Sequence, residues 1–240
     1  HNNERKNIDR RITQEALEMV RSGNCLSSDN ATIVYNPLWH KGVVGIVASR
    51  LVEAFYKPTV VFTKSQGGFV TGSARSVHGF DLYGAIESCA DLLVNFGGHT
   101  YAAGLSLPAQ NIPLFRQRFE QYVKEHIRPE QVNAVLCIDA EIDFRDISRR
   151  MASDIKRFAP YGPDNSKPLF CTRQVYDYGT SKVVGRDQEH IKLELVDSKS
   201  SNVMNGIAFG QSSQARYIKT KRAFDIVYHI EENSHKRGEV

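Results

Sequence analysis

Three features are missing from this sequence, and each absence argues against a class of protein. No apolar run approaches the ~20 residues that a membrane-spanning helix requires. The first residues, His1 to Lys6, are polar and lack the apolar core of a signal peptide. The 4 cysteines have no paired spacing, which argues against a zinc site and a disulfide framework. We therefore expect a cytoplasmic protein with no membrane contact.

A fourth absence concerns metal ligands and bears directly on chemistry. The 240 residues contain no Asp-His-His triplet and no cluster of Asp and His at metal-ligand spacing. Metal-assisted hydrolysis of a phosphodiester needs such a cluster, because the bound ion activates the attacking water. We therefore expect this chain to bind no metal by itself. The formal net charge of +4 is too small to indicate a polyanionic partner on its own.

The first half of the chain alternates between helix and strand patterns. Residues 4–22 carry a single apolar stripe that ends at Gly23, which predicts a helix with a glycine cap. The alternation from about 31 to 127 indicates an α/β unit. The expected strands are 32–35, 59–63, 69–74 and 105–107, and the expected helices are 43–56, 81–94 and one that begins near Pro113.

The second half has a different pattern. Residues 138–144 alternate apolar with acidic side chains, as in a half-buried strand, and a short helix is expected over 147–157. About five strands with one helix fit a small antiparallel barrel, of which the OB-fold is the leading candidate. We expect a linker at Arg128–Gln131. The remaining predicted strands are 169–178, 181–186, 190–196, 203–209 and 223–230.

The densest motif runs from Asn95 to Gly104 and reads Asn-Phe-Gly-Gly-His-Thr-Tyr-Ala-Ala-Gly. Two adjacent glycines, Gly97 and Gly98, let the backbone approach a ligand closely or adopt a positive φ. His99 is expected at a tight turn, where its imidazole can donate to a phosphate or steady a reacting group. A Gly-Gly-His triplet alone fits a structural loop better than a site, so its interpretation depends on the other motifs.

A second motif precedes a predicted helix. The run Trp39–Arg50 places His40, Lys41 and Gly42 directly before the helix N-terminus. Free N–H groups and the positive end of the helix dipole make such a junction an anion site. A core position for Trp39 and a turn position for His40 would explain this stretch equally well.

A third motif, Gly72–Ser76, lies at the end of a predicted strand. Ser73 and Ser76 offer hydroxyl groups, and Arg75 offers a planar fork suited to a phosphate. Strand ends in open α/β sheets commonly face the ligand crevice. In isolation, a Ser-x-Arg-Ser stretch is more often part of a surface loop.

In this order and wording, the three motifs resemble the DHH-associated domain of the RecJ family, within the wider DHH phosphoesterase superfamily. The Gly97–Gly104 element is the hallmark of that domain, and the runs Trp39–Arg50 and Ser73–Ser76 are specifically RecJ-like. The resemblance implies an α/β DHH-associated domain over 25–128, which follows the end of an interdomain connecting helix over 1–24.

The second half extends the same resemblance. Phe158–Gly162 resembles the segment that leads into the OB-fold of RecJ proteins, although Asp164–Pro168 departs from the family's Gly-Asn-Pro. The resemblance implies an all-β OB-fold barrel over 129–240, and so an α+β protein overall.

The resemblance also implies a function. Proteins of this family are 5′→3′ single-stranded DNA exonucleases of repair and recombination, and this chain would be their substrate-binding C-terminal half. The manganese or magnesium ions would lie in an N-terminal DHH domain that this chain lacks, so we expect the chain alone to be inactive. The implied partners are single-stranded DNA, the DHH domain and other DNA repair proteins. We expect a monomer, because nothing supplies a coiled-coil seam.

Site residues carry over by position. By resemblance, Ser73 and Arg75 hold the terminal 5′-phosphate and His99 touches the scissile phosphate. Further candidates in the same domain are Ser76, Arg50, His40, Gly97 and Gly98. A basic groove with aromatic platforms is how OB-folds hold single strands. The candidates in the barrel are Lys182, Arg186, Lys192, Arg216, Tyr217, Lys219, Lys221 and Arg222.

Three other functions remain open. The chain would also suit a stand-alone module that binds single-stranded nucleic acid. A fragment of a DHH-type phosphodiesterase for short oligonucleotides or cyclic dinucleotides would share the Gly-Gly-His element, but the barrel strands argue against it. An interaction platform for repair proteins would leave residues 39–104 unexplained.

Overall fold

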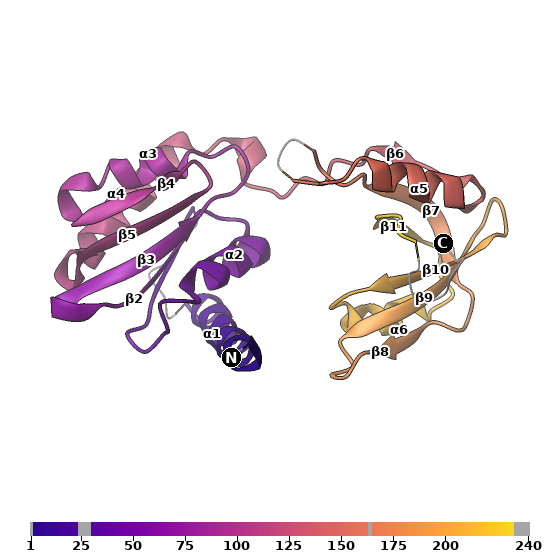
Figure 1. Ribbon diagram of the computed structural model, residues 1–240, viewed down its shortest axis with the longest axis horizontal. Helices are drawn as coiled ribbons and strands as arrows, with labels where there is room; N and C mark the ends of the chain where they lie inside the picture. The colour runs from indigo at the N-terminus through magenta and orange to yellow at the C-terminus, as the bar shows by residue number, and fades with distance from the viewer. Residues whose placement is uncertain (1, 24–29, 163–164, 233–240) are drawn as a thin grey trace. The chain divides into compact units, whose positions relative to one another are not determined.

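A five-stranded sheet organises the first half of the chain in the computed structural model, which describes residues 2–23, 30–162 and 165–232 (Figure 1). Cys25 and Asp164 lie outside the described residues. The chain divides into two units, His1–Val135 and Leu136–Val240. Among the described helices, none is long and apolar enough to cross a membrane.

The sheet of the first unit has the order β1-β2-β3-β5-β4. Only β1 and β2 are parallel, and helix α2 (Val44–Phe55) connects them, as a parallel pair requires. The other neighbours are antiparallel. The strands are β1 (Thr32–Tyr35), β2 (Thr59–Lys64), β3 (Phe69–Arg75), β4 (Asn95–His99) and β5 (Ala102–Pro108).

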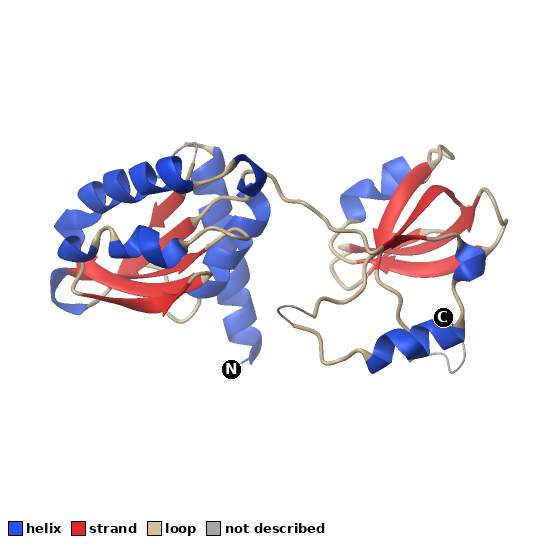
Figure 2. Ribbon diagram, turned by 90° about the horizontal axis from the view of Figure 1, so that it is seen from above, coloured by secondary structure: helices blue, strands red, loops and turns tan. Residues whose placement is uncertain are grey.

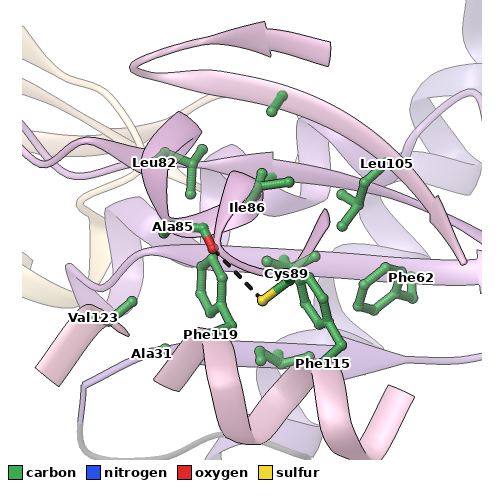
Figure 3. Close-up of a cluster of buried hydrophobic side chains, with 14 of the residues drawn as sticks. Ala31, Phe62, Leu82, Ala85, Ile86, Cys89, Leu105, Phe115, Phe119 and Val123 are labelled. Carbon is green, nitrogen blue, oxygen red and sulfur yellow. Dashed lines mark hydrogen bonds between the residues drawn. The ribbon is translucent and has the colours of Figure 1, made fainter. Parts of the chain in front are cut away.

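One face of this sheet is buried under α3 (Leu82–Glu87) and α4 (Ile112–His126). Phe62 of β2 meets Phe115 of α4 edge to face, with ring centroids 5.5 Å apart. Figure 3 shows this cluster, with the Cys89 thiol directed at the carbonyl oxygen of Ala85, 3.7 Å away. The cluster is the larger apolar core of the unit, and it sets which residues of β2, β3 and β5 face inward.

The opposite face is covered only in part. Helices α1 (Asn2–Arg21) and α2 bury Ile12 and Val47 against Val34 and Val61 of the first two strands (Figure 1). Phe69 and Pro108, paired at one end of β3 and β5, also alternate to this face, and Phe69 is 39% exposed. Beyond that pair, the side chains that alternate to this face on β3, β5 and β4 are small or polar, and all are half-buried or exposed. They are Thr71, Ser73, Arg75, Ala102, Gly104, Ser106, Asn95, Gly97 and His99. We call this set the open face.

The second unit is built on a separate six-stranded sheet of order β10-β9-β7-β11, with β6 on β7 and β8 on β9. Figure 2 shows the strands of both sheets in red. Helix α5 (Arg149–Arg157) packs Ala152 and Ile155 against Phe170, and α6 (Ala215–Ile218) is a single turn. The strands are β6 (Ala140–Glu141), β7 (Phe170–Asp177), β8 (Lys182–Val184), β9 (His190–Asp197), β10 (Val203–Ala208) and β11 (Phe224–Tyr228).

Four local expectations were wrong. Residues 95–99, where we expected no strand, form strand β4, and His99 is its last residue, directly before the tight turn formed by Thr100 and Tyr101. The strand expected over 138–144 is reduced to Ala140–Glu141. Helix α3 ends at Glu87, and a short 3-10 turn follows where the helix was expected to continue to 94. Residues 129–131, expected as linker, form a 3-10 turn in which Gln131 is buried.

Candidate nucleic-acid interface

The sheet register brings four predicted site residues onto the open face. Arg75 of β3 lies opposite Ala102 of β5, which in turn lies opposite His99 of β4. Ser73 is aligned in the same way with Gly104 and then Gly97. Directly opposite residues of an antiparallel pair point to the same face. The hydroxyl of Ser73, the guanidinium of Arg75 and the imidazole of His99 therefore project from two strands, β3 and β4, on one side of the sheet.

Helix α2 lies against this group at its N-terminal turn. Gly45, its second residue, is so close that an added Cβ would stand 3.0 Å from Nη2 of Arg75 and 3.4 Å from Oγ of Ser73. In the described part of the chain, no side chain caps the helix at Val43. The first N–H groups of a helix need acceptors from elsewhere. An anion at Ser73 and Arg75 would therefore also lie close to a helix N-terminus, which favours negative charge.

His40 lies in the turn that leads into α2. Its Nδ1 accepts a hydrogen bond from the backbone N–H of Gly42 at 3.1 Å, and the residue is exposed. A neutral imidazole that accepts at Nδ1 carries its proton on Nε2. His40 therefore presents an N–H donor at the same helix N-terminus.

The two glycines of the Gly-Gly-His motif differ in what the fold demands. Gly98 has φ +152°, and a Cβ there would stand 2.3 Å from the carbonyl oxygen of Ala102. A Cβ on Gly97 would have no neighbour within 4 Å, and one on Gly104 would have only a carbonyl oxygen at 4.0 Å. Gly98 is thus required by the sheet itself. Gly97 and Gly104 instead leave bare backbone on the open face, which a ligand can approach closely.

Two predicted site residues have other contacts. Arg50 forms a 2.8 Å ion pair with Asp9 of α1, in the middle of α2 rather than at its N-terminus. Ser76 donates its hydroxyl hydrogen to the carbonyl oxygen of Phe80 at 2.9 Å. Arg50 thus holds α1 to α2, and Ser76 holds the loop after β3. Neither belongs to the group around Arg75.

The second unit carries its candidate residues on two surfaces. Lys182 of β8 lies directly opposite Lys192 of β9, and both are exposed. Arg186 lies in the turn between these strands. The other candidates, all exposed, are on and after α6: Arg216, Tyr217, Lys219, Lys221 and Arg222. We call the surface with Lys182, Arg186 and Lys192 the first surface. The segment before α6 contacts the β8–β9 turn beside it, because the backbone N–H of Ser212 donates to the carbonyl oxygen of Glu189 at 3.2 Å.

Sequence reasoning missed the apolar part of the first surface. Ile207 of β10 lies opposite Lys192 and is 55% exposed. Phe209 is 70% exposed and meets the ring of His190 edge to face at 5.2 Å. The alternation of Val203, Asn205 and Ile207 marked one face of a strand, but only the pairing with β9 shows that this face lies beside the lysines.

The described residues offer no candidate metal site. None of their His, Cys, Asp and Glu side chains form a group of three or more that would hold a metal ion. A lone exposed His99 does not make a metal site. The described residues therefore do not fit the metal that the family resemblance implies, and we derive no chemical step through one.

Two protein families match this chain. The DHHA1 domain matches residues 29–125, and the RecJ OB domain matches residues 138–239. The single-stranded-DNA-specific exonuclease RecJ of Salmonella typhimurium is 31% identical over 97% of this chain. This chain belongs to the RecJ family. The RecJ of Bacillus subtilis is 32% identical over 83% of the chain.

The comparisons also set the extent of the likeness. The chain spans 41% of the Salmonella RecJ and 25% of the Bacillus RecJ. A crystal structure of RecJ from Thermus thermophilus in complex with Mg²⁺ covers 99% of this chain with a TM-score of 0.70 and 23% identity, and the match covers 34% of that structure. This likeness supports the fold. The expected order of a DHH-associated α/β domain followed by an OB domain is confirmed.

Proposed function

We propose that this chain is the substrate-binding part of a RecJ-type 5′→3′ exonuclease for single-stranded DNA. The observation that carries the proposal is the group on the open face, where Ser73, Arg75 and the N-terminus of α2 meet at Gly45. A hydroxyl, a guanidinium and the positive N-terminus of a helix are groups that suit a terminal phosphate. Curated relatives named as single-stranded-DNA-specific exonucleases support this substrate.

His99 would act next to that phosphate. His99 and Arg75 lie on either side of Ala102, each directly opposite it. With the terminal phosphate at Arg75, His99 would contact the next phosphate along the strand, which is the one to be cleaved. His40 supplies a second imidazole donor at α2. RecJ of Thermus thermophilus was crystallised in complex with Mg²⁺ and with Mn²⁺. Such an ion would supply an activated water for hydrolysis, and we propose that its ligands lie outside the described residues of this chain. The hydrolytic step then depends on residues in the remaining length of RecJ proteins.

The second unit would hold the strand beyond its end. Phe209 and Ile207 offer apolar surface for bases, and Lys182 and Lys192 lie beside them for phosphates. Stacking on aromatic rings with cations nearby is the sequence-tolerant mode by which OB-folds bind single strands. The cluster from Arg216 to Arg222 would extend the positive surface.

Fluorescence anisotropy with a short single-stranded DNA tests the proposal. The strand is offered with either a 5′-phosphate or a 5′-hydroxyl at one fixed salt concentration, because phosphate contacts make affinity fall steeply with salt. We expect the phosphorylated strand to bind more tightly, and Arg75→Ala to lose this preference. Arg116→Ala is the control, because Arg116 lies on α4 and pairs with Glu120. Equal binding of both strands by the parent chain would contradict the assignment of Ser73 and Arg75.

A further inference from the structure

Two aromatic rings lie at the end of the sheet that carries Arg75 and His99. The rings of His78 and Tyr101 are stacked, with centroids 6.3 Å apart and an interplanar angle of 27°. Both residues are exposed, and Tyr101 is 52% exposed. At this separation the two rings are offset and overlap only in part, which leaves apolar ring surface in water. None of the roles proposed above uses this pair.

The backbone fixes the pair next to the phosphate group. Tyr101 lies in the two-residue turn between β4 and β5 and precedes Ala102, the residue that lies opposite both His99 and Arg75. Its carbonyl oxygen accepts from the backbone N–H of Ser76 at 3.1 Å, which extends the pairing of β3 with β5 one step past Arg75. Adjacent Cα atoms are ~3.8 Å apart, so the turn begins within one residue of the proposed phosphate contacts.

The loop that carries His78 is fixed as well. The hydroxyl of Ser76 and the carbonyl oxygen of Phe80 close it at 2.9 Å, and Val77 is buried in the apolar core. His78 is therefore held outward between two anchored positions. A rigid pair of rings costs little ordering entropy when a ligand stacks on it.

We propose that the pair His78–Tyr101 is a stacking subsite for a nucleobase at the 5′ end of the bound strand. The inference rests on the proposed function, since the phosphate at Ser73 and Arg75 brings the terminal nucleotides to this end of the sheet. A base stacked here must first leave its neighbours, which duplex ends resist and single strands allow. The subsite would therefore add to the preference for single strands, separately from the phosphate contacts.

The test compares Tyr101→Ala and His78→Ala with the parent chain on two sets of 5′-phosphorylated strands. One set carries normal bases, and the other has abasic sites at its first two positions. Stacking contributes ~1–3 kcal/mol per base, so each variant should bind the normal strand roughly 5- to 150-fold more weakly. The parent chain should lose a similar factor on the abasic strand, and the variants should lose little more. Tyr101→Phe keeps the ring and should restore parental binding.

Leu114→Ala serves as the control, because it removes an exposed apolar side chain from α4. It should bind both strands as the parent chain does. Equal losses for Tyr101→Ala on the normal and abasic strands would overturn the subsite and indicate a purely structural pair, and unchanged binding would overturn it as well. In another outcome, the parent chain prefers the 5′-phosphate while the parent chain and the variants all bind normal and abasic strands equally. That result would overturn the subsite and leave the proposed function standing. A parent chain that binds no strand would contradict both proposals.

Discussion

At the scale of single residues, the two glycines before His99 have separable roles. The positive φ of Gly98 and the carbonyl oxygen 2.3 Å from its missing Cβ mean that Gly98→Ala must displace the pairing of β4 with β5. We expect a loss of several kcal/mol in the free energy of unfolding, at the high end for point mutations. Gly97→Ala meets open space and should keep parental stability.

The functional expectation for these two variants differs from the stability expectation. Gly97→Ala places a methyl group on the open face, where we propose that DNA approaches, and should weaken binding of a 5′-phosphorylated strand. Urea unfolding and anisotropy on the same samples measure both effects. Parental affinity in a stable Gly97→Ala chain would show that this part of the open face does not meet the DNA.

Asp197 provides a second test at this scale, in the core of the second unit. It is buried, and burial alone would raise its pKa, but donors from Ser200, Phe144 and Lys199 outweigh burial and hold the pKa below its usual value. A lowered pKa stabilises the folded state above the ordinary Asp pKa, and this stability is lost as the pH falls through the lowered value.

Asp197→Ala should therefore destabilise the second unit by on the order of 3 kcal/mol at neutral pH, because several donors lose their acceptor. It should also remove part of the loss of stability on acidification. Urea midpoints at pH 7 and in acid check both effects. An acid dependence identical to that of the parent chain would mean that other carboxylates account for it.

At the scale of elements, helix α2 has no side chain at Gly45, and the guanidinium of Arg75 lies against the helix at that position. Replacing a helical glycine with alanine stabilises an exposed helix by ~1 kcal/mol, yet here the new Cβ would stand 3.0 Å from the guanidinium. We expect Gly45→Ala to stay folded, with stability changed by ~1 kcal/mol or less, while the preference for a 5′-phosphate falls. Thermal unfolding and the anisotropy comparison measure the two effects. Gly206→Ala, a half-buried position in β10 of the second unit, is the control for binding at the open face.

Elements with a clear period were well predicted from the sequence. Strands β1, β2 and β3 and helices α2, α4 and α5 lie within a few residues of their expected bounds. Strand β4 was missed because Gly97 and Gly98 resemble a loop and give no apolar alternation. Its strand conformation comes from pairing with β5, a tertiary contact that local propensity does not encode. Strand β6 is shorter than expected because only Ala140 and Glu141 are paired in register with β7, although the N–H of Ile142 also donates to the carbonyl oxygen of Cys171 at 2.9 Å.

The candidate site also has a part that could be predicted from the sequence and a part that could not. The sequence indicated which residue types suit a phosphate, and Ser73, Arg75 and His99 do share the open face. It did not indicate that Arg50 pairs with Asp9, 41 positions away, or that Phe209 lies beside His190. Such contacts depend on the register and packing of distant elements, which a motif does not specify.

At the scale of the whole molecule, each unit has its own sheet and apolar core, so each should fold and bind alone. Residues 1–135 should keep the preference for a 5′-phosphate, and residues 136–240 should bind single strands without regard to the end. Joining two sites converts the second binding step into an intramolecular one, which raises affinity only for a strand long enough to reach both. The affinity of the intact chain should therefore exceed that of both fragments on long strands and match that of the first fragment on very short ones.

A series of 5′-phosphorylated strands of increasing length, measured at one salt concentration, would show this transition. A constant ratio between the intact chain and the first fragment at all lengths would mean that the second unit does not hold the same strand.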